Sequence, residues 1–208
     1  MLSPPRLALF LSLALCIGLP STAPAKPMPA RRVAACAAAK VLVEGVLSPS
    51  GSRPGAVRTA PGEDILSRFR GPDGALLLDD DPNDSRWFQV KADGLPEPVR
   101  PPARATVRTF GAARQASVTD CADVRRSITA RGMRIVASEG SPRMRRDGLY
   151  DVTTHTLTVP VVSPDGSEAL AYADSVSGPL AGGGYLVLLR RKPDGAWKIA
   201  GRMGLWIS

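Results

Sequence analysis

A run of glycines near the C-terminus is the first feature of the chain that could do chemistry. Residues 177–191 read SGPLAGGGYLVLLRR, and glycine-rich loops bind phosphate through backbone N–H groups at the start of a helix. A phosphate loop ends in Gly-Lys-Ser/Thr, and a dinucleotide loop has the spacing G-x-G-x-x-G. Here the apolar residues that follow predict a strand, so we expect a structural loop that bends a sheet. Its glycines are Gly178, Gly182, Gly183 and Gly184.

An acidic segment and a single histidine are the candidates for metal chemistry. Residues 78–84, LDDDPND, offer oxygen ligands at alternate positions, but a calcium loop starting at Asp79 would need Gly in place of Asp84 and Glu in place of Val90. This spacing favours a solvated acidic turn. His155 is the only histidine, whereas zinc sites combine several His and Cys ligands. We therefore expect no metal and no cofactor, and a half-buried, hydrogen-bonded His155.

Catalytic groups are sparse. A Ser-His-Asp triad would have to use His155, and the G-x-S-x-G motif that accompanies many such triads does not occur in the sequence. The remaining acid–base candidates are Asp151, Tyr172 and Asp174, which could form a pocket carboxylate with a tyrosine. They support one alternative, a small enzyme acting on an apolar small molecule.

Arginine dominates one part of this basic protein, whose formal net charge is +8. Between residues 100 and 146 there are eleven arginines, no lysine and three acidic residues. Guanidinium groups bind carboxylates and phosphates, so an anionic ligand or an envelope protein is a candidate partner. The local candidates for this contact are Arg143, Arg145 and Arg146. A solubilising loop in a chain rich in Ala, Arg, Gly and Pro is the alternative, and nucleic acid is not expected because aromatic residues are not interleaved with the arginines.

The N-terminus predicts export. Arg6 precedes an apolar run over residues 7–19, and Ala-Pro-Ala at 23–25 fits cleavage before Lys26. The run is shorter than the ~20 residues that span a bilayer, so no transmembrane segment is expected after cleavage of the signal at 1–25. Retention as an anchor is the alternative. The protein would then be periplasmic or secreted, where Cys36 and Cys121 are expected to form a disulfide rather than two buried thiols.

Two helices should carry these cysteines. The Ala-rich segment 30–47 predicts a helix whose apolar face includes Val33, Cys36, Val43 and Leu47. Residues 119–131 predict a second helix, capped by Thr119 or Asp120 and ended by Gly132, with an apolar stripe of Cys121, Val124 and Ile128. The Pro/Gly-rich stretch 48–62 predicts a linker. We therefore expect an N-terminal helix within 26–47, a linker at 48–62 and a single α+β domain over 63–208.

Strands are expected over most of the remaining chain. Pro-Asp-Gly occurs at 72–74, 164–166 and 193–195 and predicts turns; the first would join 65–70 to 75–79 as a hairpin. Residues 86–92 and 105–111 predict strands, and the Pro-rich stretch 93–102 predicts neither element. From Leu149 onward, alternating apolar residues predict a four-stranded antiparallel meander, with one face of the last strand formed by Trp197, Ile199, Met203, Leu205 and Ile207. The fold class is α+β, a curved antiparallel sheet with helices packed on one face.

The last sixty residues resemble a group of small secreted bacterial proteins of unassigned function. That group ends in a strand with "Al.Y", a "CGxLCGxG"-like loop, an apolar strand, "dGkWkv" and "WIS". The matching segments are 169–172, 177–183, 185–190, 194–199 and 206–208. This chain has Ser177 and Ala181 where the group often has cysteines, so no thiol role is carried over. The helix and sheet order also resembles the cystatin-like and NTF2-like cone, which hosts isomerases, dehydratases, inhibitors and binding modules.

The functional expectation is therefore a non-catalytic binding or accessory module of the cell envelope. The alternative is a small enzyme of the NTF2-like type, in the isomerase or dehydratase class. A third reading is a periplasmic inhibitor or chaperone-like accessory protein. A pocket enclosing a carboxylate with a raised pKa would favour the enzyme, and an exposed arginine patch would favour the binding module.

Overall fold

A computed structural model describes the chain at residues 29–47, 55–59, 66–67, 70–71, 76, 86–91, 94–137 and 143–208. The expected signal at 1–25, the acidic segment at 78–84 and the turn at 72–74 lie outside these residues. Arg70 and Leu76 form an antiparallel bridge on either side of that turn. Within the described residues, no helix is both long and apolar enough to cross a membrane.

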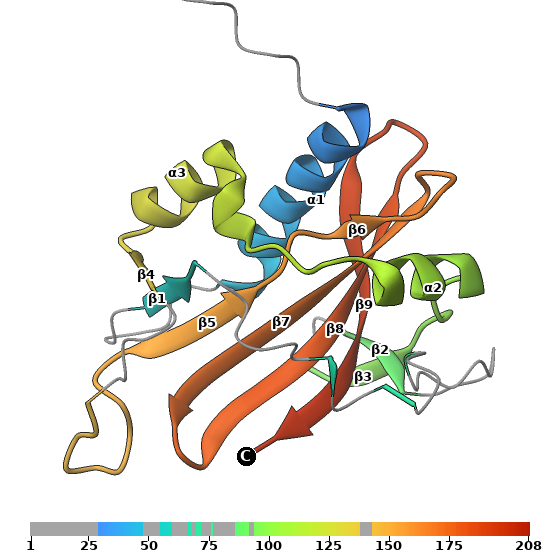
Figure 1. The fold of residues 1–208 in the computed structure, drawn as a ribbon. Helices are drawn as coiled ribbons and strands as arrows, with labels where there is room; N and C mark the ends of the chain where they lie inside the picture. The colour runs from blue at the N-terminus through green and yellow to red at the C-terminus, as the bar shows by residue number, and fades with distance from the viewer. Residues whose placement is uncertain are drawn as a thin grey trace, which may run out of the picture.

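One curved mixed sheet organises the fold, which is α+β as predicted (Figure 1). Its strands lie in the order β3-β2-β9-β8-β7-β5-β1-β4, and β6 pairs with β7. Strand β1 runs parallel to β4 and β5, and the other pairs are antiparallel. The strands are β1 Gly55–Arg58, β2 Trp87–Val90, β3 Pro96–Pro98, β4 Arg134–Val136, β5 Thr153–Leu157, β6 Val161–Val162, β7 Glu168–Gly178, β8 Ala181–Arg191 and β9 Trp197–Ile207.

Strand β5 and the long strands β7, β8 and β9 form the predicted four-stranded antiparallel meander. One Pro-Asp-Gly turn precedes β7 and the other joins β8 to β9. Their glycines, Gly166 and Gly195, adopt φ of 74° and 84°, a conformation that glycine adopts without steric cost. In the second turn, the Gly195 N–H donates to the Lys192 carbonyl at 2.9 Å, and the Ala196 N–H donates to the Asp194 carboxylate at 2.9 Å. The second turn is therefore held as the sequence predicts: its Asp bonds back to the backbone, and its Gly takes the left-handed conformation.

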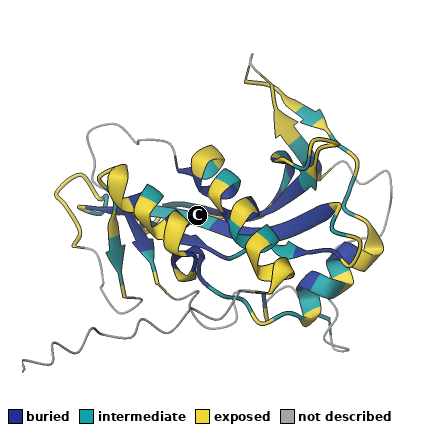
Figure 2. Ribbon diagram, turned by 90° about the horizontal axis from the view of Figure 1, so that it is seen from above, coloured by how far each residue is buried: buried dark blue, intermediate teal, exposed yellow. Residues whose placement is uncertain are grey.

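Both faces of the sheet are covered. Alternate residues of β7 face two apolar clusters: Ala169 and Ala171 contact the first, and Leu170 and Tyr172 the second. Helices α1 Ala30–Val46 and α3 Ala122–Ala130 cover the first cluster, so the two predicted helices do share one face. Helix α2, Arg104–Ala112, covers the second. Figure 2 shows the long strands largely buried between helices whose outer sides are exposed.

Helix α2 corrects the strand expected at 105–111. Thr106 and Phe110 are buried and lie four residues apart, the spacing of a helix face. The sequence signal was weak because the N-cap residue, Ala103, has no polar side chain. The cap comes instead from β7: Glu168 accepts hydrogen bonds from the Ala103 N–H at 2.8 Å and from the Thr106 hydroxyl at 2.9 Å. A carboxylate that is distant in the sequence thus accepts the hydrogen bonds offered at the start of α2.

Two further expectations were wrong because a strand occupies a segment rich in Pro or Gly. Residues 55–58 of the expected linker form β1, inside the sheet between β5 and β4. Residues 96–98 of the Pro-rich stretch form β3, an edge strand paired with β2. Proline is tolerated on an edge because its missing N–H would face away from the ladder.

Local irregularities also move residues from the faces expected for them. A register shift in the β8–β9 pairing, at Ala200, leaves Trp197 and Ile199 in the first cluster but places Met203 and Leu205 in the second. Such a bulge inverts the alternation of the strand beyond it. The second predicted helix likewise begins as a short 3-10 turn, Val118–Asp120, capped by the Ser117 hydroxyl.

Candidate functional site

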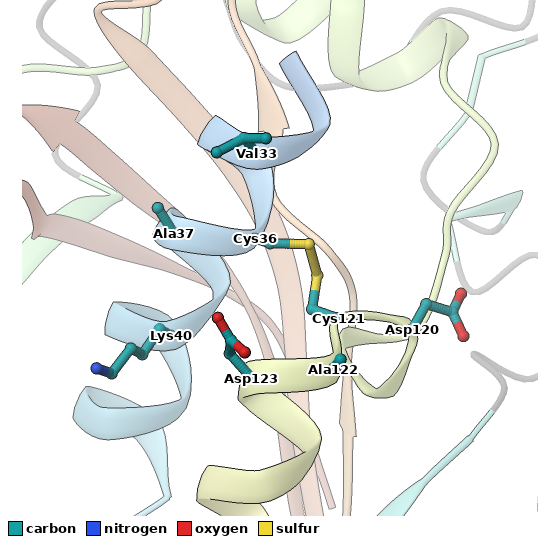
Figure 3. Close-up of a pocket in the computed structure, with 8 residues that line it drawn as sticks. All are labelled: Val33, Cys36, Ala37, Lys40, Asp120, Cys121, Ala122 and Asp123. Atoms are coloured by element: carbon teal, nitrogen blue, oxygen red, sulfur yellow. A yellow bond between two sulfur atoms is a disulfide. The ribbon is translucent and has the colours of Figure 1, made fainter. Parts of the chain in front are cut away.

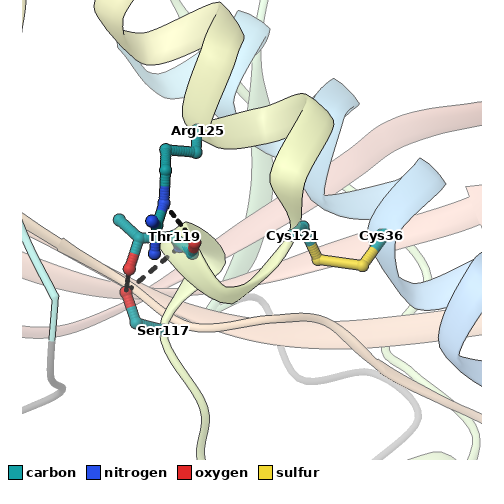
Figure 4. The surroundings of a disulfide bond; sticks show 5 residues. All are labelled: Cys36, Ser117, Thr119, Cys121 and Arg125. Atoms are coloured by element: carbon teal, nitrogen blue, oxygen red, sulfur yellow. Dashed lines mark hydrogen bonds between the residues drawn. A yellow bond between two sulfur atoms is a disulfide. The ribbon is translucent and has the colours of Figure 1, made fainter. Parts of the chain in front are cut away.

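The predicted disulfide joins α1 to the start of α3. Cys36 and Cys121 are bonded, with a Cα–Cα separation of 5.6 Å. Hydrogen bonds fix the turn that leads to Cys121: Ser117 Oγ contacts Thr119 Oγ1 at 2.9 Å, and Arg125 Nε donates to the Thr119 carbonyl at 3.1 Å (Figure 4). Both cysteines therefore lie at the contact between two helices that cover the first apolar cluster.

A shallow groove of about 380 Å³ lies beside this disulfide (Figure 3). Its lining residues are Val33, Cys36, Ala37, Lys40, Asp120, Cys121, Ala122 and Asp123. Val33 was expected on the buried face of its helix, yet it is 51% exposed at this groove. The two carboxylates point in different directions, and that of Asp123 pairs with Arg126. The carboxylates that line the groove therefore do not converge on one point.

The glycines at 182–184 are strand residues of β8, paired with both β7 and β9. Their small size makes room for an indole ring. A Cβ atom on Gly184 would lie 2.1 Å from Trp206 Nε1, and one on Gly182 would lie 3.2 Å from Trp206 Cζ3. The ring of Trp206 therefore rests on the backbone of β8. This contact links the glycine run to the Trp-Ile-Ser ending, and the run is structural.

Trp206 begins a hydrogen-bond chain that crosses the sheet. Its Nε1 donates to the Tyr172 hydroxyl at 3.0 Å, and that hydroxyl donates to Asp174 Oδ2 at 3.0 Å. The other oxygen, Asp174 Oδ1, accepts from the Thr156 N–H at 2.9 Å. Two of the three acid–base candidates are thus brought together. Asp151 is not among them, because its carboxylate accepts from the Arg143 N–H at the end of the sheet.

Burial of Asp174 dominates the electrostatics of this hydrogen-bond chain. It raises the pKa of Asp174, and the hydrogen bonds from Tyr172 and Thr156 and the charge of Arg58 only partly oppose that rise. Tyr172 is 1% exposed, and its hydroxyl both donates and accepts. The polar groups of Trp206, Tyr172 and Asp174 are therefore satisfied by one another and by the Thr156 N–H. Trp206 was not identified from the sequence, because its partner lies 34 residues away.

Gly184→Ala should displace the Trp206 indole, because the new methyl group would overlap the ring. We expect a loss of about 1–3 kcal/mol in the free energy of unfolding, the usual cost of overpacking. Gly204→Ala is the matched control, since a Cβ there meets nothing within 4 Å. Urea unfolding measures both variants. Equal midpoints for the two would contradict this role of Gly184.

The expected anion-contact arginines lie on a small hairpin at one end of the sheet. Met144 and Tyr150 form its bridge, and the Tyr150 N–H donates to the Ser177 carbonyl of β7 at 2.7 Å. Arg145 pairs with Asp147 at 3.5 Å. Within the part of the chain that the structure describes, neither Arg143 nor Arg146 has an ion-pair partner.

Apolar side chains are exposed at the same end. Leu180, in the β7–β8 turn, is 87% exposed, Ile207 is 83% exposed and Met144 is 65% exposed. These positions lie at the same end of the sheet, because Ile207 pairs with Gly183 in β8 and the hairpin is bonded to β7 beside the turn. We call this region the sheet tip: residues 143–151, the turn at 179–180, and Ile207. Figure 1 shows the hairpin and the turn projecting together from the lower end of the sheet.

His155 lies in β5, between Val57 of β1 and Ser175 of β7. It is 6% exposed, and neither ring nitrogen has a hydrogen-bond partner among the residues that the structure describes. The half-buried, hydrogen-bonded state expected for it is therefore wrong. Desolvation lowers its pKa to about 4. The described residues also contain no group of three His, Cys, Asp or Glu side chains placed to hold a metal ion.

Acid should destabilise the protein through His155. The folded pKa of about 4 lies below the ordinary 6.5, so the unfolded chain binds more protons between these values. The free energy of unfolding should therefore fall by about 3 kcal/mol as pH drops from about 6.5 to about 4. His155→Leu should remove this slope. Urea titrations at a series of pH values test it, and an unchanged slope in the variant would assign the effect elsewhere.

Comparisons of the chain with protein families, with curated proteins and with solved structures found no match.

Proposed function

We propose that this protein is an exported, non-catalytic binding module that contacts an anionic partner through the sheet tip. The observation that carries the proposal is that exposed Leu180, Ile207 and Met144 lie at the same end of the sheet as Arg143 and Arg146, two arginines with no ion pair among the described residues. Exposed apolar groups beside cations cost solubility and mark interaction surfaces.

Export is part of the proposal. The apolar run at 7–19 and the small residues at 23–25 support a signal segment. The Cys36–Cys121 disulfide supports an oxidising destination such as the periplasm or the exterior, where such bonds persist.

The enzyme alternative has one observation in its favour, the bonded Tyr172–Asp174 pair with its raised carboxyl pKa. Catalysis would require these groups to reach a substrate. Each polar atom of the pair already has a partner inside the sheet, and the groove beside the disulfide does not include them. The binding role therefore has the stronger support.

Photocrosslinking in the producing cells tests the binding role without naming the partner. We expect Leu180→p-benzoylphenylalanine to yield adducts after irradiation, because position 180 lies at the contact. Val90→p-benzoylphenylalanine is the control, since Val90 is 60% exposed on β2, away from the tip. Adducts at 180 but not at 90 support the proposal. No adduct at 180, or equal adducts at both positions, would overturn it.

A further inference from the structure

The sheet tip has the layout of a surface that enters a membrane interface. Its apolar residues come from three separate segments: the hairpin at 143–151, the β7–β8 turn and the end of β9. Each projects one exposed apolar side chain, namely Met144, Leu180 and Ile207, and none of these three is aromatic. Protein interfaces instead concentrate their energy in aromatic and Arg anchors that fill pockets.

The charges at the tip favour an anionic surface. Two carboxylates lie in the hairpin, and both are engaged internally: Asp147 by Arg145 and by the Leu149 N–H, and Asp151 by the Arg143 N–H. No described carboxylate forms an ion pair with the guanidinium groups of Arg143 and Arg146, which are exposed. Arginine binds phosphate oxygens with two parallel hydrogen bonds.

Apolar side chains and arginines at the same end of the sheet suit the two layers of a bilayer surface. The apolar groups can enter the boundary between headgroups and acyl chains while the guanidinium groups stay at the level of the phosphates. A soluble polyanion would satisfy the arginines but leave Leu180, Ile207 and Met144 in water.

We propose that the sheet tip binds anionic phospholipid surfaces, with Leu180, Ile207 and Met144 inserted at the interface and Arg143 and Arg146 on the lipid phosphates. This inference rests on the proposed binding role and names its partner. It requires no membrane-spanning segment.

Vesicle flotation tests it with the purified, disulfide-bonded chain. The probes are vesicles of phosphatidylcholine alone and of phosphatidylcholine with one third phosphatidylglycerol. We expect binding to the anionic vesicles only, and weaker binding as salt is raised. Arg143→Gln/Arg146→Gln should weaken binding about thirtyfold, from the usual effect of two arginines at an anionic surface.

The matched control is Arg108→Gln/Arg114→Gln, which removes the same charge from exposed positions on and beyond α2. Leu180→Ser should weaken binding at least tenfold, and Val90→Ser should not. Circular dichroism confirms that each variant is folded. Equal loss in the two arginine pairs would overturn the proposal, because net charge alone would then explain binding. An absence of flotation would overturn it too; protein adducts at position 180 would then leave the binding role intact with a protein as partner.

Discussion

Glu168→Ala should lower the free energy of unfolding by about 3 kcal/mol, because the carboxylate is buried and serves three donors. Glu168 is 4% exposed. It accepts from Arg190 Nε at 3.1 Å, from the Thr106 hydroxyl and from the Ala103 N–H. Loss of the Glu168 carboxylate would remove the acceptor that Arg190 and the start of α2 share. Urea unfolding followed by circular dichroism measures the change.

Two variants separate this network from a general effect of losing a carboxylate. Glu168→Gln keeps oxygen as an acceptor for Ala103 and Thr106, so its loss should be smaller than that of Glu168→Ala. Glu97→Ala removes an exposed carboxylate paired with Lys91 and should leave the urea midpoint almost unchanged. A midpoint for Glu168→Ala that matches Glu97→Ala would show that the network does not hold α2.

Removing the disulfide should have the largest effect in this chain. Cys36 and Cys121 are 85 positions apart, and closing a loop of that length restricts the unfolded chain by about 4.5 kcal/mol in the chain-entropy treatment. Cys36→Ala/Cys121→Ala should lower the free energy of unfolding by about that amount. The dependence of that free energy on urea should also steepen, since the uncrosslinked chain exposes more surface when it unfolds.

A reductant provides the control for the disulfide. It should shift the unfolding midpoint of the parent chain to that of the double variant, and leave the double variant unchanged. A parent chain whose midpoint does not respond to complete reduction would contradict the stabilising role.

The sequence predicted the elements whose signals are local. The Pro-Asp-Gly turns at 164–166 and 193–195, the apolar stripe of α3 and the alternation of β7 were each readable within a short window. The pairing of Cys36 with Cys121 followed from counting the cysteines that remain after the expected cleavage. These local signals are also enough to predict the α+β fold class.

The features that the sequence did not predict depend on distant partners. The sequence predicts a strand where helix α2 lies, because the cap of that helix is Glu168, on another element. It predicts a linker where strand β1 lies, because the ladder partners of β1 are on β4 and β5. The bulge at Ala200, which inverts the faces of β9, has no sequence signal of its own. At the candidate site, Tyr172 and Asp174 were identified, but Trp206 and the exposed tip required the three-dimensional arrangement.

The position of β1 has a consequence for the order of events during synthesis. This strand lies near the N-terminus, yet its two neighbours are β4 and β5, which follow much later in the chain. A chain that emerges from its N-terminus must therefore hold residues 55–58 without their first partner until residue 136 has appeared, and without their second until residue 155. Such long-range parallel pairing is slow to form. Insertion of β1 between two strands made later should therefore be a late step of folding.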